Sequence, residues 1–159
     1  MEITRNLVLI ASTVTLGMMC GLFTSFSYAI MPALKRTDDR TFVHAMQRIS
    51  VAILNGWFAV GFGGALVFTA IAAVLHLGDP ALPWIVAALV LYAATLAVTF
   101  VLHVPLNNAL VAAGDPDGIA DLAAVRAGFE PVWVRYNVVR SLTSTAALAC
   151  AAVALIQAG

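Results

Sequence analysis

Long apolar blocks constrain the fold of this chain more than any other feature of its sequence. Four stretches consist mostly of aliphatic, aromatic and small residues, near residues 6–31, 50–76, 83–104 and 132–157. Each stretch is long enough for the roughly 20 residues that an α-helix needs to cross the hydrocarbon core of a bilayer. Helices satisfy all of their backbone polar groups internally, which lipid requires. The sequence therefore predicts an all-α, integral membrane four-helix bundle.

Composition supports this fold class and limits the partners. The 159 residues are 62% hydrophobic and only 10% charged, whereas about a quarter of the residues in a soluble domain are charged. The length predicts a single transmembrane domain over residues 1–159. The formal net charge is zero, which argues against nucleic acid as a partner. The expected surroundings are the lipid bilayer.

The distribution of lysine and arginine predicts an orientation. One end of the predicted bundle carries only Arg5, and the two long polar regions carry Lys35, Arg36, Arg40, Arg48, Arg126 and Arg135. Basic loops stay in the cytoplasm, so both long loops are predicted to be cytoplasmic and both termini outside, in an inner or plasma membrane of the bacterial type. Within the second loop, residues 119–128 are a candidate for a short helix on the membrane surface.

The third apolar block carries a polar stripe. Its members follow one another at steps of three, four, four and four residues: Tyr92, Thr95, Thr99, His103 and Asn107. Such spacing places them on one face of a helix. Because lipid cannot solvate them, this face is predicted to point at the other helices. In the first block, the small residues Gly17, Gly21 and Ser25 permit close helix packing. They would also permit a homodimer, although nothing requires one.

A second polar face begins the fourth block. Trp133, Asn137 and Arg140 stand at positions i, i+4 and i+7 and therefore share a face. Arg140 has two interpretations. It is either an anchor whose side chain reaches the membrane surface, or a buried cation that holds an anion. Trp133 alone would fit a membrane-interface belt, but its neighbours on the same face favour the second interpretation.

His103 is the candidate base. A neutral imidazole accepts a proton near neutral pH, and Asn107, one helical turn further on, could orient it or bind an oxyanion. Two alternatives stay open: a hydrogen-bonded interface residue, or a haem ligand paired with His44. No metal site is expected, because His76 is predicted on the opposite membrane face from the other two histidines.

Short motifs connect these residues to a known family. Pro105-x-Asn107-Asn108 follows the third block, and Trp133-x-x-x-Asn137-x-x-Arg140 opens the fourth. Together with the span layout, they resemble the anthrone oxygenase-like family of small four-helix membrane proteins, also known as DUF1772. Further similar positions are Gly21, Ser25, Pro32 and Gln47. Characterised fungal members oxidise anthrones to anthraquinones with dioxygen and without a cofactor.

The resemblance implies a cofactor-independent oxygenase. His103 would remove a proton from an electron-rich phenolic substrate, and Arg140, Asn107 and Asn137 would stabilise the anion. The substrate-binding residues would be Trp133, Tyr28, Ser25, Asn108 and Gln47. The alternative is a non-catalytic membrane protein that binds a lipid-soluble aromatic or a haem, or that serves as an accessory subunit.

Overall fold

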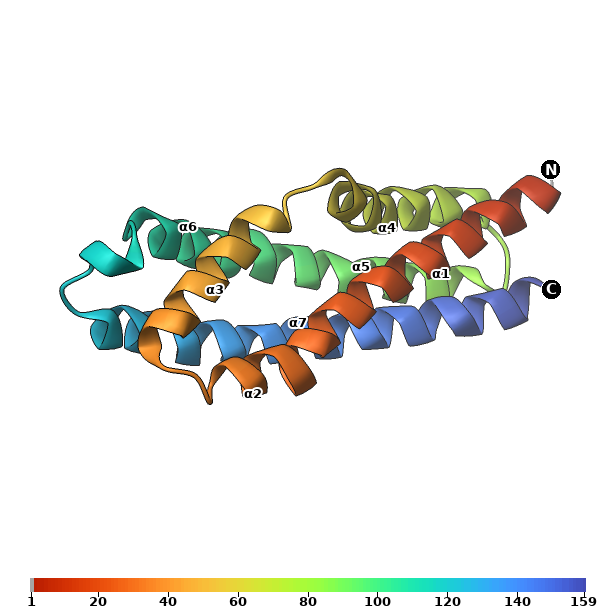
Figure 1. Cartoon of the computed structure of the whole chain (residues 1–159). Helices are drawn as coiled ribbons and strands as arrows, with labels where there is room; N and C mark the ends of the chain where they lie inside the picture. Colours follow the sequence, from red (N-terminus) through yellow and green to blue (C-terminus); the bar gives the residue numbers. More distant parts are fainter. Residues whose placement is uncertain (1) are drawn as a thin grey trace.

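The computed structural model describes residues 2–159, and that range contains helices but no strand. Within it, four helical segments are long and apolar enough to cross a membrane: Glu2–Leu34, Gly56–Leu75, Leu82–Ala112 and Leu122–Ala158. Figure 1 shows these segments running along one long axis, with both termini at the same end. The predicted all-α membrane bundle is confirmed.

Two of the long segments change helix type before a proline. The first consists of α1 (Glu2–Ser25), the π-helix η1 (Phe26–Ile30) and α2 (Met31–Leu34). The third consists of α5 (Leu82–Val98), the π-helix η2 (Thr99–His103) and α6 (Val104–Ala112). The third segment therefore continues eight residues past residue 104, where the apolar block ends in the sequence.

The wide turns explain why Pro32 and Pro105 do not end these helices. Proline lacks a backbone N–H and its ring clashes with the carbonyl four residues earlier. In each segment a residue next to the proline bonds five residues back instead, since Met31 N–H donates to the Phe26 carbonyl and Val104 N–H to Thr99. The longer register of a π-turn makes room for the ring.

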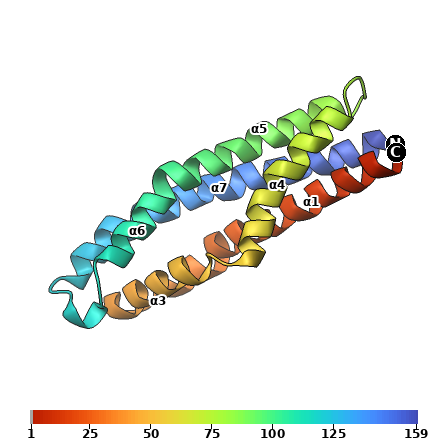
Figure 2. The ribbon, with the colours of Figure 1, turned by 90° about the horizontal axis from the view of Figure 1, so that it is seen from above.

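The remaining side of the bundle is built from two helices instead of one. α3 (Asp39–Ala52) and α4 (Gly56–Leu75) are joined by residues 53–55. The apolar block predicted from residue 50 is therefore split, and its first residues belong to α3. Asn55 makes the break, because its side chain accepts from Phe58 N–H at 3.1 Å and donates to the Ala52 carbonyl at 2.9 Å. Figure 2 shows α3 and α4 following one another along the bundle.

The last segment is one continuous helix, α7 (Leu122–Ala158), preceded by the short 3-10 helix η3 (Pro116–Gly118). The short surface helix expected within residues 119–128 is not separate, because residues 122–128 form the first turns of α7. The Asp121 carboxylate accepts from Ala124 N–H at 2.8 Å and so caps this early start. The helix also passes through Pro131 without a break.

α3 is held against the ends of the third and fourth segments, where these extend beyond α4. Arg126 on α7 donates to the Asp39 carboxylate at 3.0 Å and to the Thr37 carbonyl at 2.9 Å, and its guanidinium lies 4.4 Å from the Phe42 ring centroid. On the other flank, Gln47 donates to the carbonyls of Leu110 and Gly114, both at 2.9 Å. α3 thereby covers the part of the bundle that the shorter α4 leaves open.

The polar stripe of the third segment points inward as predicted. Tyr92, Thr95, Thr99 and His103 are all buried. The Tyr92 hydroxyl donates to the Phe62 carbonyl at 2.9 Å, and the hydroxyls of Thr95 and Thr143 lie 2.7 Å apart between α5 and α7. Each polar group thus has a partner on a neighbouring helix, which lipid could not supply.

Candidate functional site: an apolar cavity with a buried arginine

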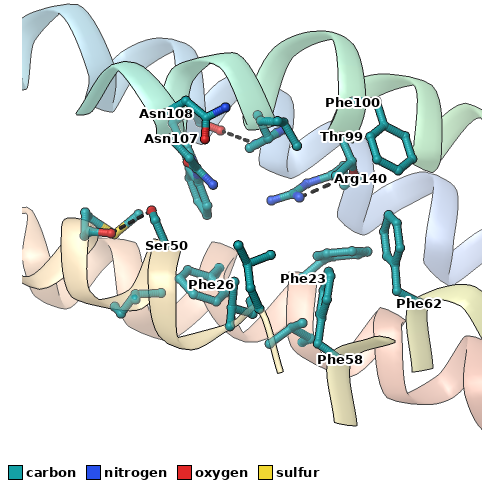
Figure 3. Close-up of a pocket in the computed structure, with 18 of the residues that line it drawn as sticks. Phe23, Phe26, Ser50, Phe58, Phe62, Thr99, Phe100, Asn107, Asn108 and Arg140 are labelled. Atoms are coloured by element: carbon teal, nitrogen blue, oxygen red, sulfur yellow. Dashed lines mark hydrogen bonds between the residues drawn. The ribbon is translucent and has the colours of Figure 1, made fainter. Parts of the chain in front are cut away.

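A cavity of about 450 Å³ lies beside the break between α3 and α4. Every long element contributes to its wall: Phe23 and Phe26 from the first segment, Ser50 from α3, Phe58 and Phe62 from α4, Thr99, Phe100, His103 and Asn107 from the third segment, and Trp133 and Arg140 from α7. Figure 3 shows Arg140 reaching into this space among the phenylalanines, with Asn107 and Asn108 on another part of the wall. The cavity exists because no continuous helix fills the fourth side.

Arg140 is the cation of the cavity. The residue is only 7% exposed, and among residues 2–159 no carboxylate lies within 4.0 Å of its guanidinium. One Nη donates to the Asn137 amide oxygen at 2.8 Å, and the other lies 3.5 Å from the Thr99 hydroxyl. Its Nε is buried without a hydrogen-bond partner in the described chain. An uncompensated buried charge is costly, and an anionic ligand would offset that cost.

Aromatic rings hold the guanidinium on two sides. Its central carbon lies 4.4 Å from the Phe23 ring centroid and 5.5 Å from that of Trp133. Cation–π contacts of this kind stabilise a cation that has little water around it. Arg140 is therefore kept inside the bundle rather than directed to the membrane surface.

Asn137 fixes the position of Arg140 rather than lining the cavity. It is almost fully buried, and its amide nitrogen donates to the Phe23 carbonyl at 3.0 Å and to the Ser27 hydroxyl at 2.9 Å. Its amide oxygen is then oriented toward the arginine. The bonds to Phe23 and Ser27 tie α7 to the first segment at the level where η1 begins.

His103 reaches the cavity from the end of η2. Its exposed fraction is 1%, and its Nε2 lies 3.3 Å from the Trp133 carbonyl. A carbonyl can only accept, so this nitrogen carries the hydrogen and Nδ1 carries the lone pair. Nδ1 is buried and has no partner among the described residues. The Trp133 ring packs edge-on against the imidazole, with centroids 5.1 Å apart. In the neutral form of the imidazole, this arrangement leaves a proton-accepting nitrogen inside the bundle.

Trp133 and the paired asparagines form another part of the wall. Trp133 Nε1–H donates to the Asn107 amide oxygen at 3.0 Å. No hydrogen bond to another described residue engages the Asn107 amide nitrogen or the Asn108 side chain. The wall therefore offers amide donors as well as the guanidinium, and apart from Ser50, Thr99 and His103 the rest of it is apolar.

Three of the predicted substrate-binding residues lie elsewhere. Tyr28 is 73% exposed and is not part of the cavity wall. Ser25 donates to the carbonyl of Gly21 within its own helix at 2.6 Å. The Gln47 amide nitrogen donates to two carbonyls at the end of α6 and therefore does not face the cavity. The π-turn of η1 rotates the helix face beyond Ser25, and this rotation explains why Tyr28 is exposed instead of lining the cavity.

The histidines do not converge. His44 is exposed on α3 and lines a separate, shallower pocket with Gly114 and Asp115, whereas His103 lies in the main cavity. His76 ends α4 and its Nδ1 donates to the Ala72 carbonyl at 2.8 Å. Within residues 2–159, no three histidine, cysteine or acidic side chains come together.

Sequence reasoning missed the aromatic wall. Phe58 and Phe62 stand four residues apart on α4 and stack with their centroids 4.9 Å apart, and Phe62 meets Phe100 edge-on at 5.8 Å. The spacing of Phe58 and Phe62 places both rings on one face of a helix, and this pattern was available in the sequence. No such pattern identifies Phe100, because the direction of its side chain depends on the π-turn of η2.

The fold and the site define a class of protein: an integral membrane helical bundle that encloses an apolar cavity with one unpaired arginine. Comparison with known families is more specific. The family model described as anthrone oxygenase matches residues 55–150, which is more than half of the chain. The protein therefore belongs to the anthrone oxygenase family. The curated proteins and the solved structures gave no match to the chain. The matched region contains α4 to α6 and most of α7, including His103, Asn107, Trp133 and Arg140.

Proposed function

We propose that this membrane protein oxidises a phenolic, anthrone-type aromatic with dioxygen inside the cavity, without a cofactor. The observation that carries the proposal is the unpaired, buried guanidinium of Arg140 in an aromatic-lined space that the His103 imidazole also lines. Membership of the family supports the reaction class. The roles of the individual side chains follow from their chemistry.

The first step is removal of a proton. His103 Nδ1 takes a proton from the methylene carbon of the substrate, which leaves a delocalised enolate. Arg140 and the Asn107 amide stabilise the negative charge on its oxygen, and they are oriented before the substrate arrives. Asn137 is a positioning residue, because it holds Arg140. Trp133 and the phenylalanines pack against the rings of the substrate and exclude water.

The later steps consume one molecule of dioxygen. The enolate passes one electron to dioxygen, and the carbon radical and superoxide combine to form a carbon–oxygen bond. The peroxide takes the proton from His103 and becomes a hydroperoxide. His103 then removes the second methylene proton, and the electrons of that carbon–hydrogen bond form the carbonyl and break the oxygen–oxygen bond, which expels hydroxide. The hydroxide and a proton give water, so the products are one quinone and one water.

Oxygen uptake by the purified protein tests the proposal. We expect uptake when 1,8-dihydroxyanthrone is added, above the spontaneous rate, with one dioxygen consumed per anthraquinone formed. His103→Ala and Arg140→Leu should each reduce the enzymatic rate by about 100-fold or more. Wild-type rates in both variants would refute the mechanism.

An absorption spectrum of the same sample addresses the alternative function. The apolar cavity would also suit a protein that binds an aromatic or a haem without reacting. Saturable binding of anthraquinone without oxygen uptake would support the binding protein, and a Soret band would indicate haem.

We further propose that the overhanging end of the bundle, with α3 and the 113–121 loop, faces the cytoplasm and that both termini lie outside. The exposed basic side chains Lys35, Arg36 and Arg40 lie at that end, and basic segments stay on the cytoplasmic side. The proposed reaction needs only one copy of the chain, since a single copy supplies every wall of the cavity.

A further inference from the structure

The cavity has a side opening with a mostly apolar rim. Leu54 on the α3–α4 linker and Gly63 on α4 lie on one side, and Phe100 and Val104 lie on the other. All four are exposed although they line the cavity, with Leu54 at 76% and Phe100 at 60%. Ala59 and Asn108 are exposed lining residues as well, and Asn108 is the polar member of the rim. A residue that lines a cavity and is also exposed lies at its mouth. The mouth therefore opens sideways, between α4 and the η2–α6 stretch.

Two features keep this mouth open. The chain turns away at residues 53–55, so no helix covers the cavity there. Gly63 adds no side chain, and a Cβ built on it would meet nothing within 4 Å. Toward the end of the bundle that holds the termini, the edge-on pair of Phe62 and Phe100 closes the opening, and Figure 3 shows these two rings next to each other.

The mouth lies at the level of the bilayer. α4 is a membrane-length helix that begins at Gly56, and Gly63 is only two turns into it. Trp57 and Val60, next to the mouth on α4, are exposed apolar residues. Tryptophan at the start of a spanning helix marks the interface between lipid and water. The opening therefore faces the hydrocarbon layer just below that interface.

We propose that the cavity is filled sideways from the bilayer through this mouth, and that its ligand is a lipid-soluble weak acid that passes the mouth neutral and ionises beside Arg140. An anion would not dissolve in the lipid at an apolar rim. Inside, the unpaired guanidinium stabilises the ionised form. The inference rests on the proposed function for the aromatic nature of the ligand, but the route and the ionisation concern binding alone.

Binding kinetics in phosphatidylcholine nanodiscs test the route. The probe is 2-hydroxyanthraquinone, followed by quenching of tryptophan fluorescence. Gly63→Leu and Val104→Phe narrow the mouth from its two sides. Gly56→Leu and Val101→Phe make the same changes at exposed positions outside the cavity wall, where Gly56 also has open space and Val101 is 68% exposed.

We expect both mouth variants to slow association and dissociation of the probe by about tenfold each, with the dissociation constant within about threefold of wild type. A narrowed passage raises the barrier in both directions, whereas a lost binding contact mainly raises the dissociation rate. Both controls should keep wild-type rates. Wild-type rates in the two mouth variants would refute the route.

Ionisation is tested by the colour of the bound probe. The absorption of 2-hydroxyanthraquinone moves to longer wavelength when its hydroxyl ionises, and 2-methoxyanthraquinone cannot ionise. We expect the shifted band in the wild type at a pH where the probe is neutral in empty nanodiscs. Arg140→Leu should remove the band and weaken binding of the hydroxy compound by about tenfold more than that of the methoxy compound.

An unshifted band in the wild type, or equal losses for the two compounds, would refute the ionisation. Both measurements record binding without turnover. Slow binding in the mouth variants together with absent oxygen uptake would therefore refute the proposed reaction and leave the route intact.

Discussion

At the residue scale, the chemistry of the cavity depends on a guanidinium that no carboxylate among residues 2–159 neutralises. Its nearest partner is the neutral amide oxygen of Asn137 at 2.8 Å. Neutral partners orient the charge without cancelling it, which leaves Arg140 able to attract an anion. A carboxylate at the same place would pair with the arginine and remove this ability, and it would lose the bond that the amide nitrogen donates to the Phe23 carbonyl. The identity of residue 137 therefore matters as much as that of residue 140.

Asn137→Asp tests this argument. The new carboxylate would pair with Arg140 at the position of the present amide oxygen, and the ion pair would compete with any anionic ligand. We expect the affinity for ionised 2-hydroxyanthraquinone to fall at least tenfold, measured by titration in nanodiscs, with Arg140 still buried. Asn137→Ala is the companion variant, because it removes the partner without adding charge. Equal affinity in the aspartate variant and the wild type would contradict the argument.

At the scale of single elements, α3 is the part of the bundle on which the cavity wall most depends. It is not a span, and it supplies Met46, Ile49 and Ser50 to the wall. Its position rests on the Arg126 network on one flank and on Gln47 on the other. Gln47 binds the carbonyls of Leu110 and Gly114 at the end of α6, which a helix terminus leaves without partners.

Gln47→Leu should loosen the end of α3 that faces the cavity. The substitution removes two hydrogen bonds and leaves the carbonyl of the buried Leu110 unpaired, at a cost of about 1–3 kcal/mol in the free energy of unfolding. Thermal unfolding in detergent measures the loss. Gln157→Leu, at an exposed position of α7, is the matched control and should change little. A melting temperature of Gln47→Leu equal to that of the control would show that these bonds do not hold α3.

The start of α3 should respond to acid. The pKa of the Asp38 carboxyl lies below its ordinary value, chiefly because it accepts a hydrogen bond from the backbone N–H of Thr41. A carboxyl with a lowered pKa in the folded state stabilises the fold above its unfolded pKa, near 3.8, and this stabilisation is lost as the pH falls through the folded value. Hydrogen exchange of the first turn of α3, corrected for intrinsic rates, should accelerate between pH about 5 and about 3.

Asp38→Asn provides the control for this pH effect. Asparagine also caps helices but does not titrate in this range, so the acceleration should disappear. If both proteins accelerate alike, the loss at low pH arises from another group.

At the scale of the whole molecule, unequal helix lengths create the site. α4 has 20 residues, and the other three membrane-length segments have 31–37. At about 1.5 Å per residue, α4 spans about 30 Å, close to the thickness of the hydrocarbon core. The longer segments extend beyond it at the end opposite the termini, where α3 takes the fourth position. The cavity and its side opening lie where α3 and α4 meet.

The same arrangement gives a testable topology. Gly118→Cys and Gly159→Cys place a thiol at opposite ends of the bundle, in a background of Cys20→Ser and Cys150→Ala. We expect a membrane-impermeant maleimide to label Gly159→Cys on intact cells, and to label Gly118→Cys only after the membrane is opened. The reverse pattern would invert the proposed orientation without affecting the fold.

The sequence by itself determined the membrane bundle, the inward direction of the polar stripe and the shared face of Trp133, Asn137 and Arg140. These properties follow from local periodicity and from the cost of placing polar groups in lipid. The sequence also determined the family, through residues that stand close together in the matched region.

Only the tertiary structure decided which of those residues share a cavity. Two π-turns rotate the helix faces, so Tyr28 turns outward and Phe100 reaches the rim. Asn137 was expected to touch the ligand, but its partners on a distant segment make it a support for Arg140. The split between α3 and α4 falls inside a single apolar block, and periodicity does not reveal it. The rotation of the helix faces and the enclosure of the cavity depend on contacts between segments far apart in the chain. The pattern of neighbouring residues does not predict such contacts.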